Sequence, residues 1–168
     1  PTVEVVPQRT HTKHIGVLAT PGTVASESYV IELLKQDPTL IVTQQACPMW
    51  VPLIESGEHL SDGANYFVEK YLTELLTRDP LIDTIILGCT HYPLLQPKIE
   101  AFLSSIAHSQ STVTNHHISV VSQGSIVADS FADYLHRHPE FSQDSKGGTC
   151  KYLTTESAAK FSESASIF

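Results

Sequence analysis

The sequence predicts an α/β protein with a mostly parallel sheet flanked by helices, and two observations support this class. Short apolar runs at 14–20, 40–42 and 84–89 have the length and composition of buried parallel strands. Amphipathic segments separate these runs, so strand and helix alternate along the chain. Because parallel strands are joined by crossovers, this order predicts one sheet with helices on both faces.

The first half of the chain contains the most regular part of this alternation. After the strand at 14–20, Thr23 is expected to cap a helix, and the second strand follows at 40–42. A loop containing several prolines is expected at 47–58. Ser61 is then expected to cap a long amphipathic helix. The apolar positions of that helix are Tyr66, Phe67, Tyr71, Leu72, Leu75 and Leu76.

The second half begins with the third strand and becomes less regular. Pro97 is expected to be the first residue of the helix after this strand. A polar segment at 108–117 has the composition of a linker. The elements expected after it are a strand at 118–122, a helix at 125–137, a loop through 147–148, a strand at 152–154 and a final helix.

Composition limits the classes of function. The 168 residues are 41% apolar, which is enough for one ordinary core. The formal net charge of −8 is not offset by a basic stripe, which argues against nucleic-acid binding. No apolar run approaches the roughly 18 residues that cross a membrane, and no leader precedes the first strand. We expect a cytoplasmic protein without membrane partners, in which Cys47 and Cys150 are structural thiols rather than a disulfide framework.

A thiol, a hydroxyl and an imidazole follow the third strand, as Cys89, Thr90 and His91 in the run LGCTHYP. Gly88 allows a sharp turn before them. The carboxyl end of a parallel strand is where α/β proteins place reactive groups. Backbone N–H groups at such a turn favour a thiolate, so Cys89 is a candidate base.

Each candidate residue also has an ordinary structural explanation. Free cysteines are among the most buried residues, so Cys89 would be inert if it lay in the core. Thr23 would serve only as a cap, and Glu55 would be a solvated loop acid. His91 would be a core or turn histidine. The Cys-x-His spacing at 89–91 has no second ligand pair, and no metal is expected.

Three segments resemble the glutamate racemases of the aspartate/glutamate racemase superfamily. They are LGCTHYPLL at 87–95, IGVLATPGTV at 15–24 and ACPMWVPLIESG at 46–57. Weaker similarity continues through 120–131 to the KYLTTES stretch. The resemblance implies a Rossmann-like or flavodoxin-like lobe, and it implies a longer protein in which two such lobes face each other across a cleft.

The resemblance also implies how the chain is divided. Residues 1–13 would be an initial strand at 3–6 and a linker, and 14–111 would be a complete lobe that carries the catalytic cysteine. Residues 112–168 would complete the other lobe, whose amino-terminal part, with its Asp-Ser-Gly and Cys-Asn-Thr turns, does not occur here. Without it, apolar side chains of the tail would be exposed, and self-association such as a homodimer would follow. Examples of these side chains are Val120, Ile126, Phe131 and Leu135.

The family reaction implied is the interconversion of L- and D-glutamate by two cysteine bases, without a cofactor or metal. Cys89 would be the thiolate that removes the proton from L-glutamate, assisted by His91 and Glu55. Thr90, His91, Thr20 and Thr23 would bind the substrate. The second base would lie in the absent lobe, so the isolated chain is expected to be inactive. The product D-glutamate would supply peptidoglycan synthesis in a bacterium.

Two other interpretations remain open. A racemase acting on aspartate or a related acid would have the same cysteine but would be expected to lack the His and Tyr-Pro that follow Cys-Thr here. A catalytically silent binding or assembly module would bind a partner without ligand and would tolerate Cys89→Ser. The residues after Cys89 favour glutamate as substrate.

Overall fold

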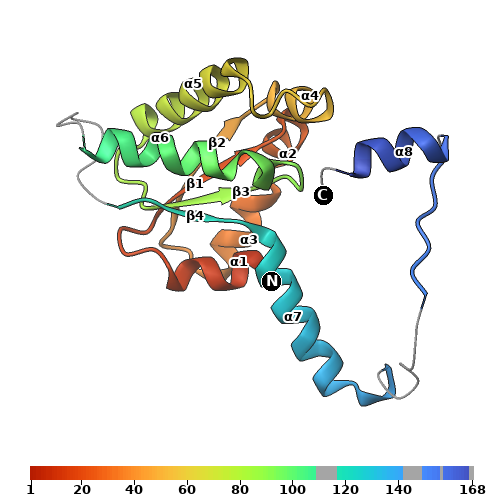
Figure 1. Ribbon diagram of the computed structural model, residues 1–168. Helices are drawn as coiled ribbons and strands as arrows, with labels where there is room; N and C mark the ends of the chain where they lie inside the picture. The colour runs from red at the N-terminus through yellow and green to blue at the C-terminus, as the bar shows by residue number, and fades with distance from the viewer. Residues whose placement is uncertain (109–116, 142–148, 156, 167–168) are drawn as a thin grey trace. The chain divides into compact units, whose positions relative to one another are not determined.

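Four parallel strands form the sheet of this protein, in the order β2-β1-β3-β4 (Figure 1). The computed structural model describes residues 1–108, 117–141, 149–155 and 157–166. The strands are β1 (His14–Ala19), β2 (Ile41–Ala46), β3 (Thr84–Leu87) and β4 (Ser119–Val121). The predicted α/β class with a parallel sheet is confirmed, and the strand order is that of a flavodoxin-like lobe.

Helices cover both faces of the sheet (Figure 1). Leu18 faces one layer of helices, whereas its neighbours Val17 and Ala19 face the other, as the alternation of a strand requires. The first layer contains α4 (Trp50–Glu55), α5 (Asp62–Arg78) and α6 (Gln96–His108). The second contains α1 (Thr2–Val5), the 3-10 turn η1 (Val6–Gln8), α2 (Pro21–Ala25) and α3 (Ser28–Gln36).

Several predicted elements are present with small changes in their bounds. Ser61 caps α5 as expected, because its Oγ accepts a hydrogen bond from the Ala64 N–H at 3.3 Å. The 3-10 turn η2 (Tyr92–Leu95) precedes α6, which makes Pro97 the second residue of that helix rather than the first. The helix α7 (Gln123–Arg137) begins two residues before the predicted start.

The amino-terminal strand predicted at 3–6 is wrong. These residues lie in α1 and η1, where Thr2 and Val6, four residues apart, are both buried. This spacing places them on one helical face, and α1 contacts α3 instead of pairing with an edge strand. The apolar residues at 3–6 were correctly identified, but the buried positions have the four-residue spacing of a helix rather than the two-residue spacing of a strand.

Two further predictions in the first half also need correction. The cap of the first helix is Thr20, not Thr23, because Thr20 Oγ1 accepts from the Thr23 N–H at 3.3 Å. Glu27 then adopts a left-handed backbone (φ 52°), which separates α2 from α3. The loop predicted at 47–58 contains α4, in which Trp50 and Ile54 are buried four residues apart.

The chain separates into two compact units, Pro1–Ser130 and Phe131–Phe168. In the first unit β4 pairs with β3 in the same sheet, so Val121 and Ile126 are buried and Val120 packs on the core. The expected exposure of Val120 and Ile126 is therefore wrong, whereas Phe131 is 59% exposed.

The second unit contains the end of α7, the 3-10 turn η3 (Pro139–Phe141) and α8 (Ala158–Ala165). Ser157 caps α8 through a 3.2 Å hydrogen bond from the Lys160 N–H. Residues 152–154 form no strand, contrary to the prediction. Most of the predicted linker at 108–117 and the loop at 147–148 lie outside the described residues. Within the described part, no helix is long and apolar enough to cross a membrane.

Candidate active site

The candidate residues gather at the carboxyl ends of β1 and β3. These central strands are adjacent, and the Gly88 N–H that follows β3 donates to the Leu18 carbonyl oxygen at 2.8 Å. The chain leaves β1 toward α3 on one face and leaves β3 toward α6 on the other (Figure 1). Diverging connections of this kind open a crevice between two strand ends, which is the usual ligand position in open α/β sheets.

Cys89, His91 and Glu55 form a chain of contacts at this edge. The Cys89 Sγ lies 3.9 Å from His91 Nδ1, and His91 Nε2 lies 3.5 Å from Glu55 Oε1. The thiol is half-buried, whereas 30% of the imidazole and 65% of the Glu55 side chain are exposed. An imidazole between a thiol and a carboxylate can exchange a proton with the sulfur while the carboxylate orients the ring.

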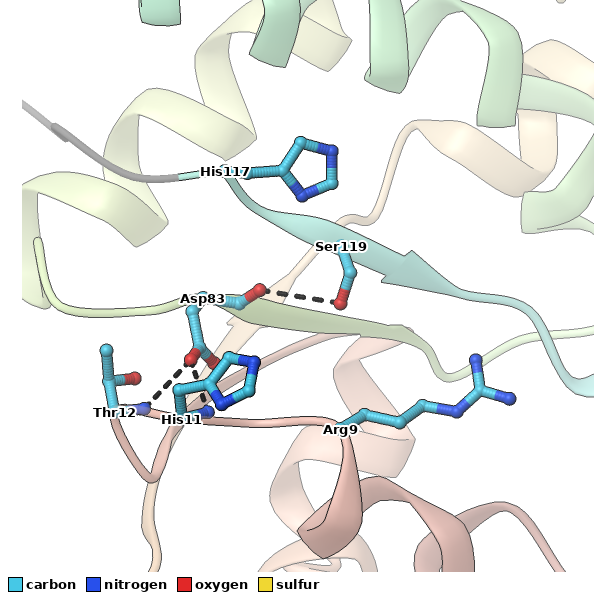
Figure 2. Close-up of a pocket in the computed structure, with 6 residues that line it drawn as sticks. All are labelled: Arg9, His11, Thr12, Asp83, His117 and Ser119. Carbon is cyan, nitrogen blue, oxygen red and sulfur yellow. Dashed lines mark hydrogen bonds between the residues drawn. The ribbon is translucent and has the colours of Figure 1, made fainter.

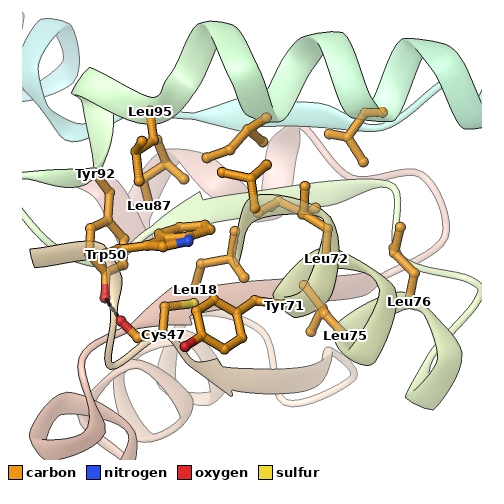
Figure 3. Packing of buried hydrophobic residues seen from close by; sticks show 14 of the residues in the cluster. Leu18, Cys47, Trp50, Tyr71, Leu72, Leu75, Leu76, Leu87, Tyr92 and Leu95 are labelled. Carbon is orange, nitrogen blue, oxygen red and sulfur yellow. Dashed lines mark hydrogen bonds between the residues drawn. The ribbon is translucent and has the colours of Figure 1, made fainter. Parts of the chain in front are cut away.

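A buried aromatic cluster holds Glu55 close to His91. Trp50, the first residue of α4, packs edge-on against Tyr92, the first residue of η2, with ring centroids 4.7 Å apart (Figure 3). The Tyr92 hydroxyl donates to the Cys47 carbonyl oxygen at 3.2 Å. Because Glu55 ends α4 and His91 immediately precedes η2, this packing fixes both elements that carry the pair.

The buried Cys47 and the half-buried Cys89 differ in their chemistry. Cys47 is 1% exposed, and burial raises the pKa of its thiol far above the ordinary value. A hydrogen bond with the backbone of Ala19 lowers this pKa by less than burial raises it, and the nearby charges of Glu74 and Cys89 add smaller upward shifts. Cys47 is therefore a protonated core residue. Cys89 is the reachable thiol of this edge, whereas the exposed Cys150 lies in the second unit.

The threonines expected to bind substrate fall into two groups. Thr20 and Thr23 lie together after β1, with their hydroxyl oxygens 2.9 Å apart. Because Thr20 also caps α2, its oxygen is already engaged as an acceptor, and its hydroxyl proton or that of Thr23 bridges the pair. Thr90 is exposed at the turn next to Cys89. The pairing of β1 with β3 brings both groups to the same edge.

Two residues at this edge were not identified from the sequence, Tyr29 and Gln123. The Gln123 Nε2 donates to the Tyr29 hydroxyl oxygen at 2.6 Å and to the Leu87 carbonyl oxygen at 3.1 Å. A Cβ on Gly88 would lie 3.1 Å from the Tyr29 ring. The glycine in LGCTHYP signals a close approach, but the sequence does not indicate which side chain approaches it.

At the opposite, amino ends of the strands the protein has a hollow of about 370 Å³ (Figure 2). Asp83 lies at its floor, and its carboxylate accepts hydrogen bonds from the backbone of His11 and Thr12 and from the hydroxyls of Thr10 and Thr84. Burial alone would raise the pKa of the Asp83 carboxyl, but these hydrogen bonds outweigh it and lower the pKa to about 2. Among the described residues, no group of three His, Cys, Asp or Glu side chains has an arrangement that could hold a metal ion.

Known proteins similar to this chain are glutamate racemases. The curated glutamate racemase of Cereibacter sphaeroides is 36% identical over 162 residues, which are 96% of this chain and 54% of that protein. The crystal structure of a glutamate racemase isoform of Bacillus anthracis matches with a TM-score of 0.81 and 28% identity, over 99% of this chain and 57% of that one. No protein-family model matches the chain.

A third similar protein has been solved with ligands. The Escherichia coli glutamate racemase, in complex with L-glutamate and an activator, matches with a TM-score of 0.61 and 27% identity, over 81% of this chain and 47% of that one. The chain thus spans about half the length of the relatives it matches. The similarity covers nearly all of this chain in sequence and in fold, and the chain belongs to the glutamate racemase family.

Proposed function

We propose that this chain is the Cys89-bearing part of a cofactor-independent glutamate racemase. The observation that carries the proposal is the contact chain from Cys89 through His91 to Glu55 at the diverging ends of β1 and β3. Its relatives are glutamate racemases, and the Escherichia coli relative binds L-glutamate. The proposed substrate is therefore glutamate.

In the proposed reaction, the Cys89 thiolate removes the α-proton of L-glutamate and becomes a thiol. A second base, supplied by a lobe outside this sequence, donates a proton to the opposite face of the α-carbon, which yields D-glutamate. The reverse reaction uses the same two groups with their roles exchanged, so no proton is gained or lost overall. Each enantiomer requires one thiolate and one thiol.

The polar groups around Cys89 have distinct proposed roles. His91 accepts or returns a proton at the sulfur, and Glu55 orients the imidazole. Thr90 and the Thr20–Thr23 pair donate hydrogen bonds to a substrate carboxylate. D-glutamate made in this way would supply peptidoglycan synthesis. Because only one base lies in this chain, the isolated chain does not invert glutamate.

Exchange of the α-proton in D2O tests the proposal. The protein is assayed by NMR with its remaining lobe supplied, using L-glutamate, D-glutamate and L-aspartate, beside Cys89→Ser and Cys150→Ser as a matched control. We expect exchange with both glutamate enantiomers in the parent protein, at least about a thousandfold loss of exchange with L-glutamate in Cys89→Ser, and no loss in Cys150→Ser. Absence of exchange in the folded two-lobed protein contradicts the proposal, and exchange confined to aspartate changes the substrate.

A further inference from the structure

The end of β3 is held by two side chains from other parts of the chain, Gln123 and Tyr29. Gln123 is the first residue of α7, and both of its hydrogen bonds come from Nε2, one to the Leu87 carbonyl oxygen and one to the Tyr29 hydroxyl. Leu87 is the last residue of β3 and lies two positions before Cys89. The side chain therefore joins α7, α3 and the strand that delivers the thiol.

Gln123 replaces a strand partner that β4 does not supply. The pairing of β3 with β4 ends at Ile86 and Val121, so it stops one residue before the end of β3. On the other side, the turn is fixed by the hydrogen bond from the Gly88 N–H to the Leu18 carbonyl oxygen. The end of β3 is therefore held on its β1 side by the Gly88–Leu18 hydrogen bond and on its β4 side by Gln123.

Tyr29 completes the arrangement by packing on the turn itself. Its ring lies 3.1 Å from the position that a Cβ on Gly88 would take, so the close approach depends on glycine at this position. Burial raises the pKa of its phenol, the hydrogen bond from Gln123 lowers it by less, and the charge of Cys89 raises it again. The phenol is thus a neutral group beside the thiol, and its oxygen is oriented by Gln123.

We propose that Gln123 and Tyr29 are positioning residues that fix the Gly88–Cys89 turn and so keep the Cys89 sulfur beside His91 Nδ1, 3.9 Å away. The catalytic meaning of this arrangement rests on the proposed function, but the restraint on the thiol does not. Because a thiolate reacts as a nucleophile whether or not glutamate binds, its alkylation rate reports the restraint directly.

The experiment measures alkylation of Cys89 by iodoacetamide as a function of pH, in the 168-residue chain with Cys150→Ser so that one exposed thiol is removed. Cys47 is buried, and mass spectrometry of the peptides confirms which thiol has reacted. Gln123→Ala removes two hydrogen bonds and is expected to slow alkylation at pH 7 at least about fivefold, which is the effect of one ordinary hydrogen bond, and to move the pH–rate profile to higher pH. Tyr29→Phe, which keeps the ring, is expected to have a similar effect.

A matched control and a double variant separate positioning from general stability. Gln96 is also the first residue of a helix, but its Nε2 donates to Glu100 of the same helix, so Gln96→Ala should leave the profile unchanged. The double variant of Gln123 and Tyr29 should be no slower than the slower single variant, because both remove one shared hydrogen bond. Thermal melting is measured in parallel.

Two outcomes overturn the inference. One is a pH–rate profile of Gln123→Ala that superimposes on the parent profile. The other is that the rate losses of the two single variants multiply in the double variant, or that they scale with the loss of thermal stability. Neither outcome bears on glutamate, so a protein that fails to exchange the α-proton of glutamate can still show the predicted alkylation. Failure of this inference is thus distinguishable from failure of the proposed function.

Discussion

The polar side chains at the two ends of the sheet differ in how closely they are hydrogen-bonded and in how exposed they are. At the amino end, the Asp83 carboxylate accepts four hydrogen bonds of 2.6–3.0 Å, two on each oxygen. At the carboxyl end, the Cys89–His91 and His91–Glu55 contacts measure 3.9 and 3.5 Å. Asp83 is 7% exposed, whereas most of the Glu55 side chain faces solvent.

This difference separates a structural network from one suited to chemistry. A carboxylate whose acceptor positions are all occupied holds its neighbours in place but has little capacity for a ligand. Longer contacts with exposed partners contribute little stability, but the thiol and imidazole that make them are accessible to a substrate and can move a proton. The polar groups at the amino end are therefore expected to affect folding, and those at the carboxyl end to affect activity.

The largest effect on stability is expected from Asp83→Asn. The amide keeps the shape of the carboxylate but replaces one acceptor oxygen by an NH2 donor, so it cannot accept all four hydrogen bonds. We expect the free energy of unfolding at pH 7 to fall by about 2 kcal/mol, measured by urea denaturation. Activity per folded molecule should be unchanged.

The pH dependence of this loss checks its cause. The folded pKa of Asp83, about 2, lies below the ordinary value of 3.8. A depressed folded pKa means that the carboxylate stabilises the fold fully above about pH 4, and that this contribution is lost as the pH falls toward 2. The stability difference between the parent and Asp83→Asn should shrink over that window, and a constant difference would contradict the assignment.

A smaller loss, combined with an effect on the active site, is expected from Gly88→Ala. The new Cβ would lie 3.1 Å from the Leu18 carbonyl oxygen, from Ala19 Cβ and from the Tyr29 ring, so the turn or the ring must shift. We expect a loss of about 1–2 kcal/mol in the free energy of unfolding and slower alkylation of Cys89. Gly124→Ala is the matched control.

Gly124 is a glycine at which the structure has room for a Cβ. Gly124 is inside α7, and apart from its chain neighbours and the backbone of that helix, no described residue lies within 4 Å of a Cβ placed there. Replacing a helical glycine by alanine should leave stability unchanged or raise it by up to about 1 kcal/mol. If Gly88→Ala behaved in the same way, the close approach of Tyr29 would have no energetic consequence.

The sequence predicts the central strands of the sheet better than it predicts the first residues of the chain. The runs in β1 and β3 are short, apolar and bounded by turn residues, so their type and position follow from composition alone. The run at 3–6 has the same composition but lies in a helix and a 3-10 turn, because contact with α3 decides its conformation. Apolar runs of four residues fit either period, and tertiary packing selects one.

The candidate site divides in the same way. Cys89, Thr90 and His91 are neighbours in sequence, so their convergence needs only the turn that Gly88 indicates. Glu55 reaches His91 because Trp50 packs on Tyr92, and the spacing of these residues in the sequence does not predict that contact. Gln123 and Tyr29 are 94 positions apart, and their hydrogen bond depends on the whole path of the sheet.

The smallest effect on stability, with a large effect on activity, is expected from Glu55→Gln. The Glu55 side chain is 65% exposed and its contact with His91 is 3.5 Å, so the free energy of unfolding should change by less than about 0.5 kcal/mol. Without the carboxylate, the imidazole loses the charge that orients it. The exchange rate of the glutamate α-proton in the two-lobed protein should fall about tenfold.

A nearby acid separates a specific role of Glu55 from a general change in charge. Glu58 is exposed and follows α4 by three residues, so Glu58→Gln removes the same charge from the same surface. We expect full exchange activity in that variant. Equal activities of the two variants, or a stability loss above about 1 kcal/mol in Glu55→Gln, would show that the two ends of the sheet do not differ as their contacts indicate. A tenfold loss confined to Glu55→Gln would mean that a long, exposed contact contributes to the reaction without contributing to the fold.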